Sequence, residues 1–172
     1  MRVSLEQIPA HGVKFSADHN ESWAMEAAAE ILEARPQTLS FAVNLRRTRL
    51  GVEAKGSVAC TYPTRCARCG RDIIQSLDET FEGQFAHEAT TIADDGSVAW
   101  EELDVSFFEN ESIMLNAVLG ENLALATPAR IRCDTVGATR QEPDDSPCQL
   151  PQQDALPEFE RRSPFADLAL PE

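Results

Sequence analysis

Hydrophobic and polar residues alternate along several stretches in the first two thirds of the chain. An apolar side chain at every second position is the pattern of a β-strand that buries one face. In the longest stretch one face holds four apolar residues, and polar or acidic residues occupy the other. The apolar residues are Ile73, Leu77, Phe81 and Phe85. One alternation ends at Lys55–Gly56, which we interpret as a tight turn between two strands. The predicted strand segments are 3–5, 41–46, 52–54, 58–62, 73–85 and 103–107.

Two other stretches have the composition and apolar spacing of helices. The first, at 20–35, has an alanine-rich body with high helix propensity, a capping residue in Asn20 and a stop at Pro36. The second, from about 111 to 125, has a wide apolar face that should cover the sheet, and Pro128 closes it. Together these patterns predict an α+β fold, in which a mainly antiparallel sheet of about five strands packs against two helices.

The composition changes at Cys133. Six of the ten prolines follow residue 140, and apolar periodicity almost disappears. We therefore expect one α+β domain at 1–132 and an extended, acidic and Pro-rich tail at 133–172 that ends in a short apolar cluster. No segment is long and apolar enough to span a membrane, and the N-terminus lacks the apolar core of an export signal. These features predict a cytoplasmic protein with no membrane partner.

Charge is distributed unevenly along the chain, whose net charge is −14. Residues 36–71 carry seven Lys or Arg against one acid, whereas residues 72–129 carry thirteen acids and no Lys or Arg. This separation predicts two faces with different partners. The alternative is that the strands interleave in space, so that both signs of charge mix over an ordinary solvated surface.

Arginine dominates the positive segment, and its guanidinium group can make bidentate contacts with phosphate. Tyr62 is the only aromatic residue close by, so this segment lacks a platform on which bases could stack. RNA binding here would therefore depend on phosphates and on salt concentration, with little sequence specificity. The candidate RNA-binding residues are Arg46, Arg47, Arg49, Arg65, Arg68 and Arg71.

The spacing Cys66-Ala-Arg-Cys69 has three interpretations. Two thiolates separated by two residues can bind one tetrahedral zinc ion, and Cys133 and Cys148 could supply the other two ligands. A redox pair would prefer the N-terminus of a helix, whereas this pair lies between two predicted strands. In the third interpretation the cysteines are small residues that pack a turn and bind nothing. The sequence leaves these alternatives open.

Recognisable catalytic motifs are missing from the sequence. The three histidines, His11, His19 and His87, lie in unrelated contexts. The sequence has no Gly-rich phosphate loop, nucleophile elbow or metalloprotease pair of histidines. We therefore predict a protein that is not an enzyme and has no small-molecule substrate.

The order of several motifs resembles that of the YceD-like large ribosomal RNA subunit accumulation proteins of bacteria. A C-x-R-C turn at Cys66, Arg68 and Cys69 is followed by an acidic middle and a helical segment that contains Glu121. Where some relatives carry a further pair of cysteines after that helix, this chain has the isolated Cys133 and Cys148. The quoted matches are "CARCGRDI", "LDVSFFENESIMLNAVLGENLALATP", "DDSPC" and "RRSPFADLAL".

The resemblance implies a non-enzymatic ribosome biogenesis factor that supports accumulation of large-subunit (23S) ribosomal RNA. We expect an arginine-rich edge near the cysteine turn to contact this RNA or its precursor. The acidic stretch 72–129 would meet a basic ribosomal protein. Two other functions fit the sequence: an acidic adaptor that binds protein and no RNA, and a small zinc or thiol-redox protein that uses Cys66 and Cys69.

Overall fold

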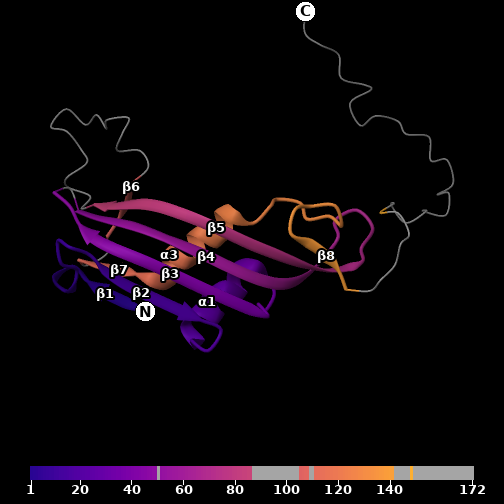
Figure 1. The fold of residues 1–172 in the computed structure, drawn as a ribbon, viewed down its shortest axis with the longest axis horizontal. Coiled ribbons are helices and arrows are strands. Elements are labelled where there is room, and N and C mark those ends of the chain that lie inside the picture. The colour runs from indigo at the N-terminus through magenta and orange to yellow at the C-terminus, as the bar shows by residue number, and fades with distance from the viewer. Residues whose placement is uncertain (50, 87–104, 109–110, 142–147, 149–172) are drawn as a thin grey trace, which may run out of the picture.

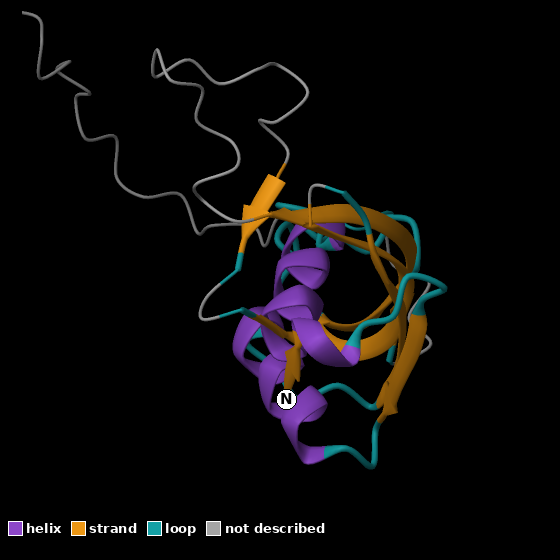
Figure 2. Ribbon diagram, turned by 90° about the vertical axis from the view of Figure 1, so that its left-hand side faces the viewer, coloured by secondary structure: helices purple, strands orange, loops and turns teal. Residues whose placement is uncertain are grey.

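The structure is a computed structural model that describes residues 1–49, 51–86, 105–108, 111–141 and 148. A long, twisted sheet forms one layer, and two helices cover one of its faces (Figures 1 and 2). This arrangement confirms the predicted α+β class and the mainly antiparallel sheet. No helix in these ranges is long and apolar enough to cross a membrane.

Within the described part of the chain, the main sheet has six strands. Five follow one another in the order β2-β3-β4-β5-β6, and β8 also pairs with β5. All pairings are antiparallel except that of β5 with β6, which is parallel. The strands are β2 (Val13–Asp18), β3 (Thr38–Arg47), β4 (Gly51–Arg65), β5 (Asp72–Ala86), β6 (Val105–Phe107) and β8 (Ala138–Arg140).

The hairpin of β4 and β5 is the longest element of the sheet. The strands pair without interruption from Gly51↔Ala86 to Arg65↔Asp72. The predicted turn at Lys55–Gly56 is therefore wrong, because both residues lie inside β4. The glycine has a packing role instead: a Cβ atom at this position would lie 2.6 Å from the Phe81 ring and 2.2 Å from the carbonyl oxygen of Ala42.

The two helices pack side by side on the inner face of the sheet (Figure 2). Helix α1 (Ser22–Leu32) and helix α3 (Leu115–Ala126) bury their apolar residues against inward-facing positions of β3 and β4. The alternation along these strands thus has the expected cause, since one face is covered and the other is exposed to solvent. The largest fully buried side chains of this core are Ile8, Phe41, Leu45, Tyr62, Ile73, Ile113, Leu115, Leu119 and Leu123.

Both predicted helix starts need correction. Asn20 does not cap α1: its backbone and side-chain N–H groups both donate to the Asp18 carboxylate, at 2.8 and 3.0 Å, and Glu21 is the capping position. The second helix begins later than residue 111, because Ser112–Met114 forms β7 and pairs with β1 (Arg2–Ser4). A short 3-10 helix, η1 (Leu5–Gln7), follows β1.

The first residues of the predicted tail belong to the folded body. Residues 138–140 form β8 on the edge of β5, and Gln141 donates its backbone N–H to the Asp72 carbonyl at 3.4 Å. The extended Pro-rich character of the tail stays a prediction, because residues 142–147 and 149–172 lie outside the described part of the chain. Residues 103 and 104 of the last predicted strand lie outside it as well.

We predict that Leu119→Ala will destabilise the protein strongly and that Leu125→Ala will not. Leu119 is 0 % exposed beneath the sheet, whereas Leu125 on the same helix is 79 % exposed. Removing the buried side chain should lower the free energy of unfolding by about 2–5 kcal/mol. Urea denaturation of both variants measures the difference. Equal effects would contradict the assignment of Leu119 to the core.

Candidate functional site: a four-cysteine cluster flanked by arginines

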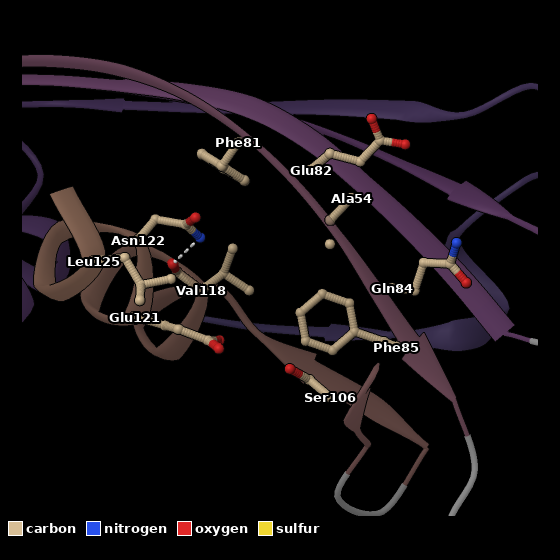
Figure 3. A pocket seen from close by; sticks show the side chains of 11 residues that line it. Ala54, Phe81, Glu82, Gln84, Phe85, Ser106, Val118, Glu121, Asn122 and Leu125 are labelled. Atoms are coloured by element: carbon tan, nitrogen blue, oxygen red, sulfur yellow. Dashed lines mark hydrogen bonds between the residues drawn. The ribbon is translucent and has the colours of Figure 1, made fainter. Parts of the chain in front are cut away.

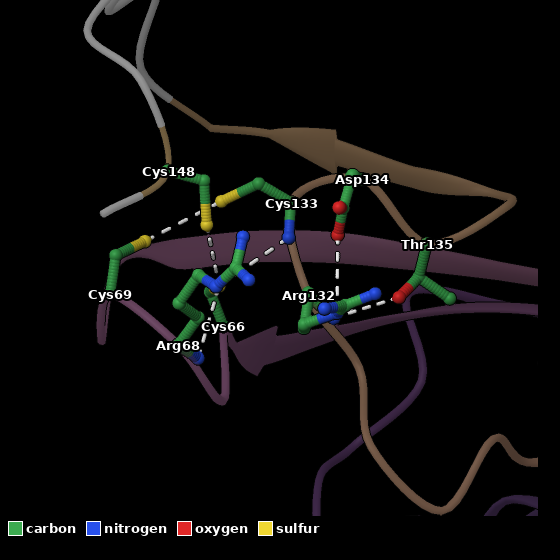
Figure 4. Close-up of polar contacts among 8 residues, drawn as sticks. All are labelled: Cys66, Arg68, Cys69, Arg132, Cys133, Asp134, Thr135 and Cys148. Carbon is green, nitrogen blue, oxygen red and sulfur yellow. Dashed lines mark hydrogen bonds and ion pairs between the residues drawn. The ribbon is translucent and has the colours of Figure 1, made fainter. Parts of the chain in front are cut away.

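Four cysteines from three separate parts of the chain point toward one another at one end of the sheet (Figure 4). The Sγ atoms of Cys66, Cys69, Cys133 and Cys148 all lie within 4.8 Å of one another. Cys66 and Cys148 are 3.5 Å apart, and Cys69 and Cys133 are 3.6 Å apart. All four are free thiols, so the structure brings together the four residues that the sequence named as candidate metal ligands.

The first two cysteines lie in the reversal between β4 and β5. The Cys66 N–H donates to the Arg71 carbonyl at 2.8 Å, and the Gly70 N–H donates to the Cys66 carbonyl at 2.9 Å. These bonds close a compact turn that holds both thiols on one side. The pair therefore lies in a β-hairpin and lacks the helix N-terminus that a typical redox pair uses.

Cys133 is positioned by a loop that is tied to the hairpin at two places. Near its start, the Ala67 N–H of the cysteine turn donates to the Ile131 carbonyl at 2.8 Å. Near its end, the Ser76 N–H of β5 donates to the Gly137 carbonyl at 2.9 Å. Residues 131–137 are thus held along β5, which places Cys133 above the turn.

A buried polar side chain adds to this attachment. Gln75 is 0 % exposed, and its Nε2 atom donates to the Val136 and Ser76 carbonyls, at 2.8 Å each. Gly137 allows the close approach of the loop, because it has φ +79° and a Cβ atom there would lie 2.4 Å from the Ser76 oxygen. The loop of residues 131–137 therefore covers Gln75 and accepts one of its hydrogen bonds. Most of this loop belongs to the segment that was predicted to be an extended tail.

Backbone N–H groups point at the sulfur of Cys66. The amides of Arg68 and Cys133 each donate to its Sγ atom at 3.4 Å. Burial by itself would raise the pKa of Cys66, but hydrogen bonds from Cys69, Arg68 and Cys133 outweigh burial and lower the pKa to about 6. Burial and the neighbouring cysteines, Cys66 first, raise the pKa of Cys133 to about 12. Hydrogen bonding therefore favours the thiolate form of Cys66.

The fifth cysteine is separate from this cluster. Cys60 faces the core from β4 and is 2 % exposed, and burial raises its pKa to about 11. It fits the interpretation in which a cysteine is a small packing residue, and it provides an internal comparison for the other four.

The structure divides the six predicted RNA-binding arginines into two groups. Arg65, Arg68 and Arg71 lie at the cysteine turn, where β4 ends. The other three, Arg46, Arg47 and Arg49, lie where β4 begins. Fourteen steps along β4 separate the two places by roughly 45 Å. A single arginine-rich edge, as the sequence analysis expected, is therefore not formed.

Two of the three arginines at this far end of the sheet, Arg46 and Arg47, are engaged with other groups. Arg46 forms an ion pair with Glu53 at 2.8 Å, and Arg47 donates to the Leu5 carbonyl at 2.7 Å. Lys55 bridges Glu53 and Glu82 across the outer face of the sheet, at 3.2 and 2.7 Å. In this region the two signs of charge mix, as the alternative interpretation of the charge pattern foresaw.

Among the described residues around the cysteine cluster, by contrast, positive charge accumulates. The segment that follows α3 brings Arg130 and Arg132 to the turn, and β8 places Arg140 opposite Ile73. Residues 65–72 and 130–141 together hold six arginines and two acids, Asp72 and Asp134. The acids pair with Arg65 at 3.2 Å and with Arg132 at 3.3 Å. We call Arg65, Arg68, Arg71, Arg130, Arg132 and Arg140 the cysteine-end arginines.

Three of the six cysteine-end arginines, Arg130, Arg132 and Arg140, were not among the RNA-binding residues predicted from the sequence. Their position follows from Cys133: if this residue joins Cys66 and Cys69, the neighbouring Arg130 and Arg132 must lie near the turn as well. The available indication was therefore the cysteine itself, since the charge pattern of residues 36–71 pointed elsewhere.

A second surface feature lies between β5 and α3. Two adjoining hollows of about 440 and 460 Å³ have walls of mixed polarity that include the apolar side chains of Phe81, Phe85 and Leu125. Figure 3 shows the first of them. Glu121 borders one hollow and Glu79 the other. Six of the thirteen acids in the acidic stretch are described, and three of them line the groove, since Glu82 borders both hollows. We call this feature the acidic groove.

A family model described as "Large ribosomal RNA subunit accumulation protein YceD" matches residues 54–170 of the chain. The match covers more than half of the sequence and includes all four cysteines of the cluster. No curated protein and no solved structure matches the chain.

We predict that Gly137→Ala will loosen the loop that carries Cys133, because the new methyl group would collide with the β5 backbone and because φ is +79°. The free energy of unfolding in urea should fall by about 1–3 kcal/mol. Gly83→Ala is the matched control, since a Cβ atom there meets nothing within 4 Å. A loss at Gly83 as large as that at Gly137 would contradict this account of the loop.

Proposed function

Because the chain belongs to the YceD family of large ribosomal RNA subunit accumulation proteins, we propose that it supports this accumulation by binding RNA through the cysteine-end arginines. The family name states a role in accumulation of large-subunit ribosomal RNA and does not denote an enzyme class. The observation that carries the proposal is the convergence of six arginines, from the two segments 65–72 and 130–141, beside one cysteine turn.

The charge and exposure of this surface suit a phosphate backbone. Arg68 and Arg130 are exposed. Arg65 and Arg132 each form an ion pair, with Asp72 and Asp134, but keep 80 % and 45 % of their side-chain surface exposed. Tyr62 is 1 % exposed and therefore cannot stack on a base. Binding would rest on phosphate contacts, which hold an RNA in place and release counterions but read little sequence.

The far-end arginines are not part of the proposed RNA surface. Arg46 is neutralised by Glu53, and Arg47 is committed to a backbone carbonyl. Both also lie beside a region in which acids and bases alternate across the strands. A polyanion would gain less attraction there than at the cysteine end.

We further propose that the acidic groove receives a basic segment of a ribosomal protein. The apolar side chains in its walls can bury aliphatic side chains, and Glu79 and Glu121 can pair with lysine or arginine of the partner. Leu125, 79 % exposed at this groove, would become buried on binding. Opposite charges at such a contact accelerate association and disfavour acidic competitors.

The adaptor that binds protein and no RNA remains the principal competing function. It would use the acidic groove alone, and its effect on ribosomal RNA would be indirect. Ribonuclease treatment distinguishes the two functions in a pull-down from cell extract. RNA-bridged partners are lost after treatment, whereas a partner held in the acidic groove is retained.

We predict that replacing Arg68, Arg130 and Arg132 together by Gln will weaken binding to a large-subunit ribosomal RNA fragment at low salt. Each lost phosphate contact should reduce the slope of log K against log[salt] by about 0.7–0.9, so the triple variant should lose roughly 2 to 3. Fluorescence anisotropy across a salt titration measures both quantities.

The matched control replaces Arg46, Arg47 and Arg49 by Gln, which removes the same amount of charge from the far end of the sheet. This control should keep most of the wild-type affinity and slope. Circular dichroism checks that both variants are folded. Equal losses in the two variants, or no RNA binding by the wild type at any salt concentration, would refute the proposed surface.

A further inference from the structure

We propose that Cys66, Cys69, Cys133 and Cys148 bind one structural Zn²⁺ ion. The proposal rests on the arrangement of the four sulfur atoms and is independent of the RNA-binding proposal. Thiolate sulfur is a preferred ligand of zinc, and four cysteines form a common closed zinc site in proteins.

The distances between the sulfur atoms fit a tetrahedron around one ion. With Zn–S bonds of about 2.3 Å, the ligand atoms of a regular tetrahedron are about 3.8 Å apart. Two of the six distances are 3.5 and 3.6 Å, and none exceeds 4.8 Å. The sulfurs therefore surround a space suited to one ion, and small side-chain rotations would bring each of them to bonding distance.

The groups around the sulfurs are those that a thiolate site needs. Two backbone amides donate to Cys66 Sγ at 3.4 Å, an interaction that stabilises and orients a metal-bound thiolate. Zinc with four thiolates carries a net charge of −2, and the cysteine-end arginines supply opposite charge beside it. Without a negative site between them, these arginines would repel one another across the turn. The negative charge of the zinc-bound cluster would reduce this repulsion.

The site is closed, which indicates a structural rather than a catalytic ion. Four protein ligands fill a tetrahedral zinc ion and leave no position for water or substrate. The ion would join the hairpin turn to the loop of Cys133 and to Cys148. These segments are 64 and 79 residues from Cys69 along the chain. Such a link should stabilise the folded state, because the unfolded chain lacks the assembled site.

Zinc explains the cluster better than the alternatives do. Packing alone does not require four thiols to converge, and the buried Cys60 shows what a packing cysteine looks like in this protein. A mononuclear iron site with four thiolates has the same geometry. Zinc suits a purely structural site better, because Zn²⁺ does not change its oxidation state.

The decisive experiment measures the metal content of the untagged full-length protein. We expect about one zinc per chain by elemental analysis and native mass spectrometry. Removal with a chelator under reducing conditions should lower the thermal midpoint, and zinc should restore it. Cobalt added to the metal-free protein should produce the sulfur-to-metal charge-transfer band and the strong visible absorption of a tetrahedral thiolate site.

Two variants identify the ligands. Cys148→Ser should weaken zinc binding by about ten-fold or more and alter the cobalt spectrum, since one thiolate is lost. Cys60→Ala should keep about one zinc per chain and the wild-type cobalt spectrum, because this cysteine lies outside the cluster. The cobalt spectrum of the wild type remains decisive if Cys148→Ser fails to fold.

Absence of stoichiometric zinc together with no thiolate spectrum on cobalt addition would overturn the proposal. Iron in place of zinc, or a wild-type cobalt spectrum in Cys148→Ser, would overturn it as well. The outcome is separable from that of the RNA titration. A zinc-loaded protein that does not bind RNA would refute only the proposed RNA surface. A protein that binds RNA but contains no zinc and gives no thiolate spectrum with cobalt would refute only the zinc site.

Discussion

The uninterrupted pairing of β4 with β5 governs both the core and the cysteine end of this protein. Fifteen residues of each strand are held in one register, from Gly51↔Ala86 to Arg65↔Asp72. A slip by one residue would move the inward-facing apolar side chains of one strand to the solvent face. The hydrophobic pattern that forms the core therefore also determines where the chain reverses. The cysteine turn occupies that reversal.

The segment that follows α3 completes this end of the sheet. It returns along β5 as a loop and a short strand, held by Gln75 and by the backbone bonds of residues 67 and 76. Its return brings a thiol and three arginines to a turn that already has two thiols and three arginines. Arginines from two distant segments of the sequence become concentrated in space because both segments lie at the same end of β5.

The sequence predicted those features that local periodicity controls. Alternation at 41–46 and 73–85 identified β3 and β5, because one face of each strand is buried and the other is not. The wrong turn at Lys55–Gly56 has a physical reason, since glycine there serves ring packing and not chain reversal. The pairing of β1 with β7 depends on residues more than a hundred positions apart, which no local pattern reveals. The same wrong turn divides β4 into two short strands. Because β4 is in fact one strand of fifteen residues, the arginines at its two ends lie far apart.

The four cysteines of the cluster are added at widely separated points during synthesis of the chain. Cys66 and Cys69 are synthesised with the central hairpin, whereas Cys148 comes after α3 and β8. Since a nascent chain folds from its N-terminal part onward, the sheet can form while the cluster still lacks its last thiol. Completion of the cluster is thus a late step of biosynthesis, and a truncated product that ends before residue 148 could not assemble all four sulfurs.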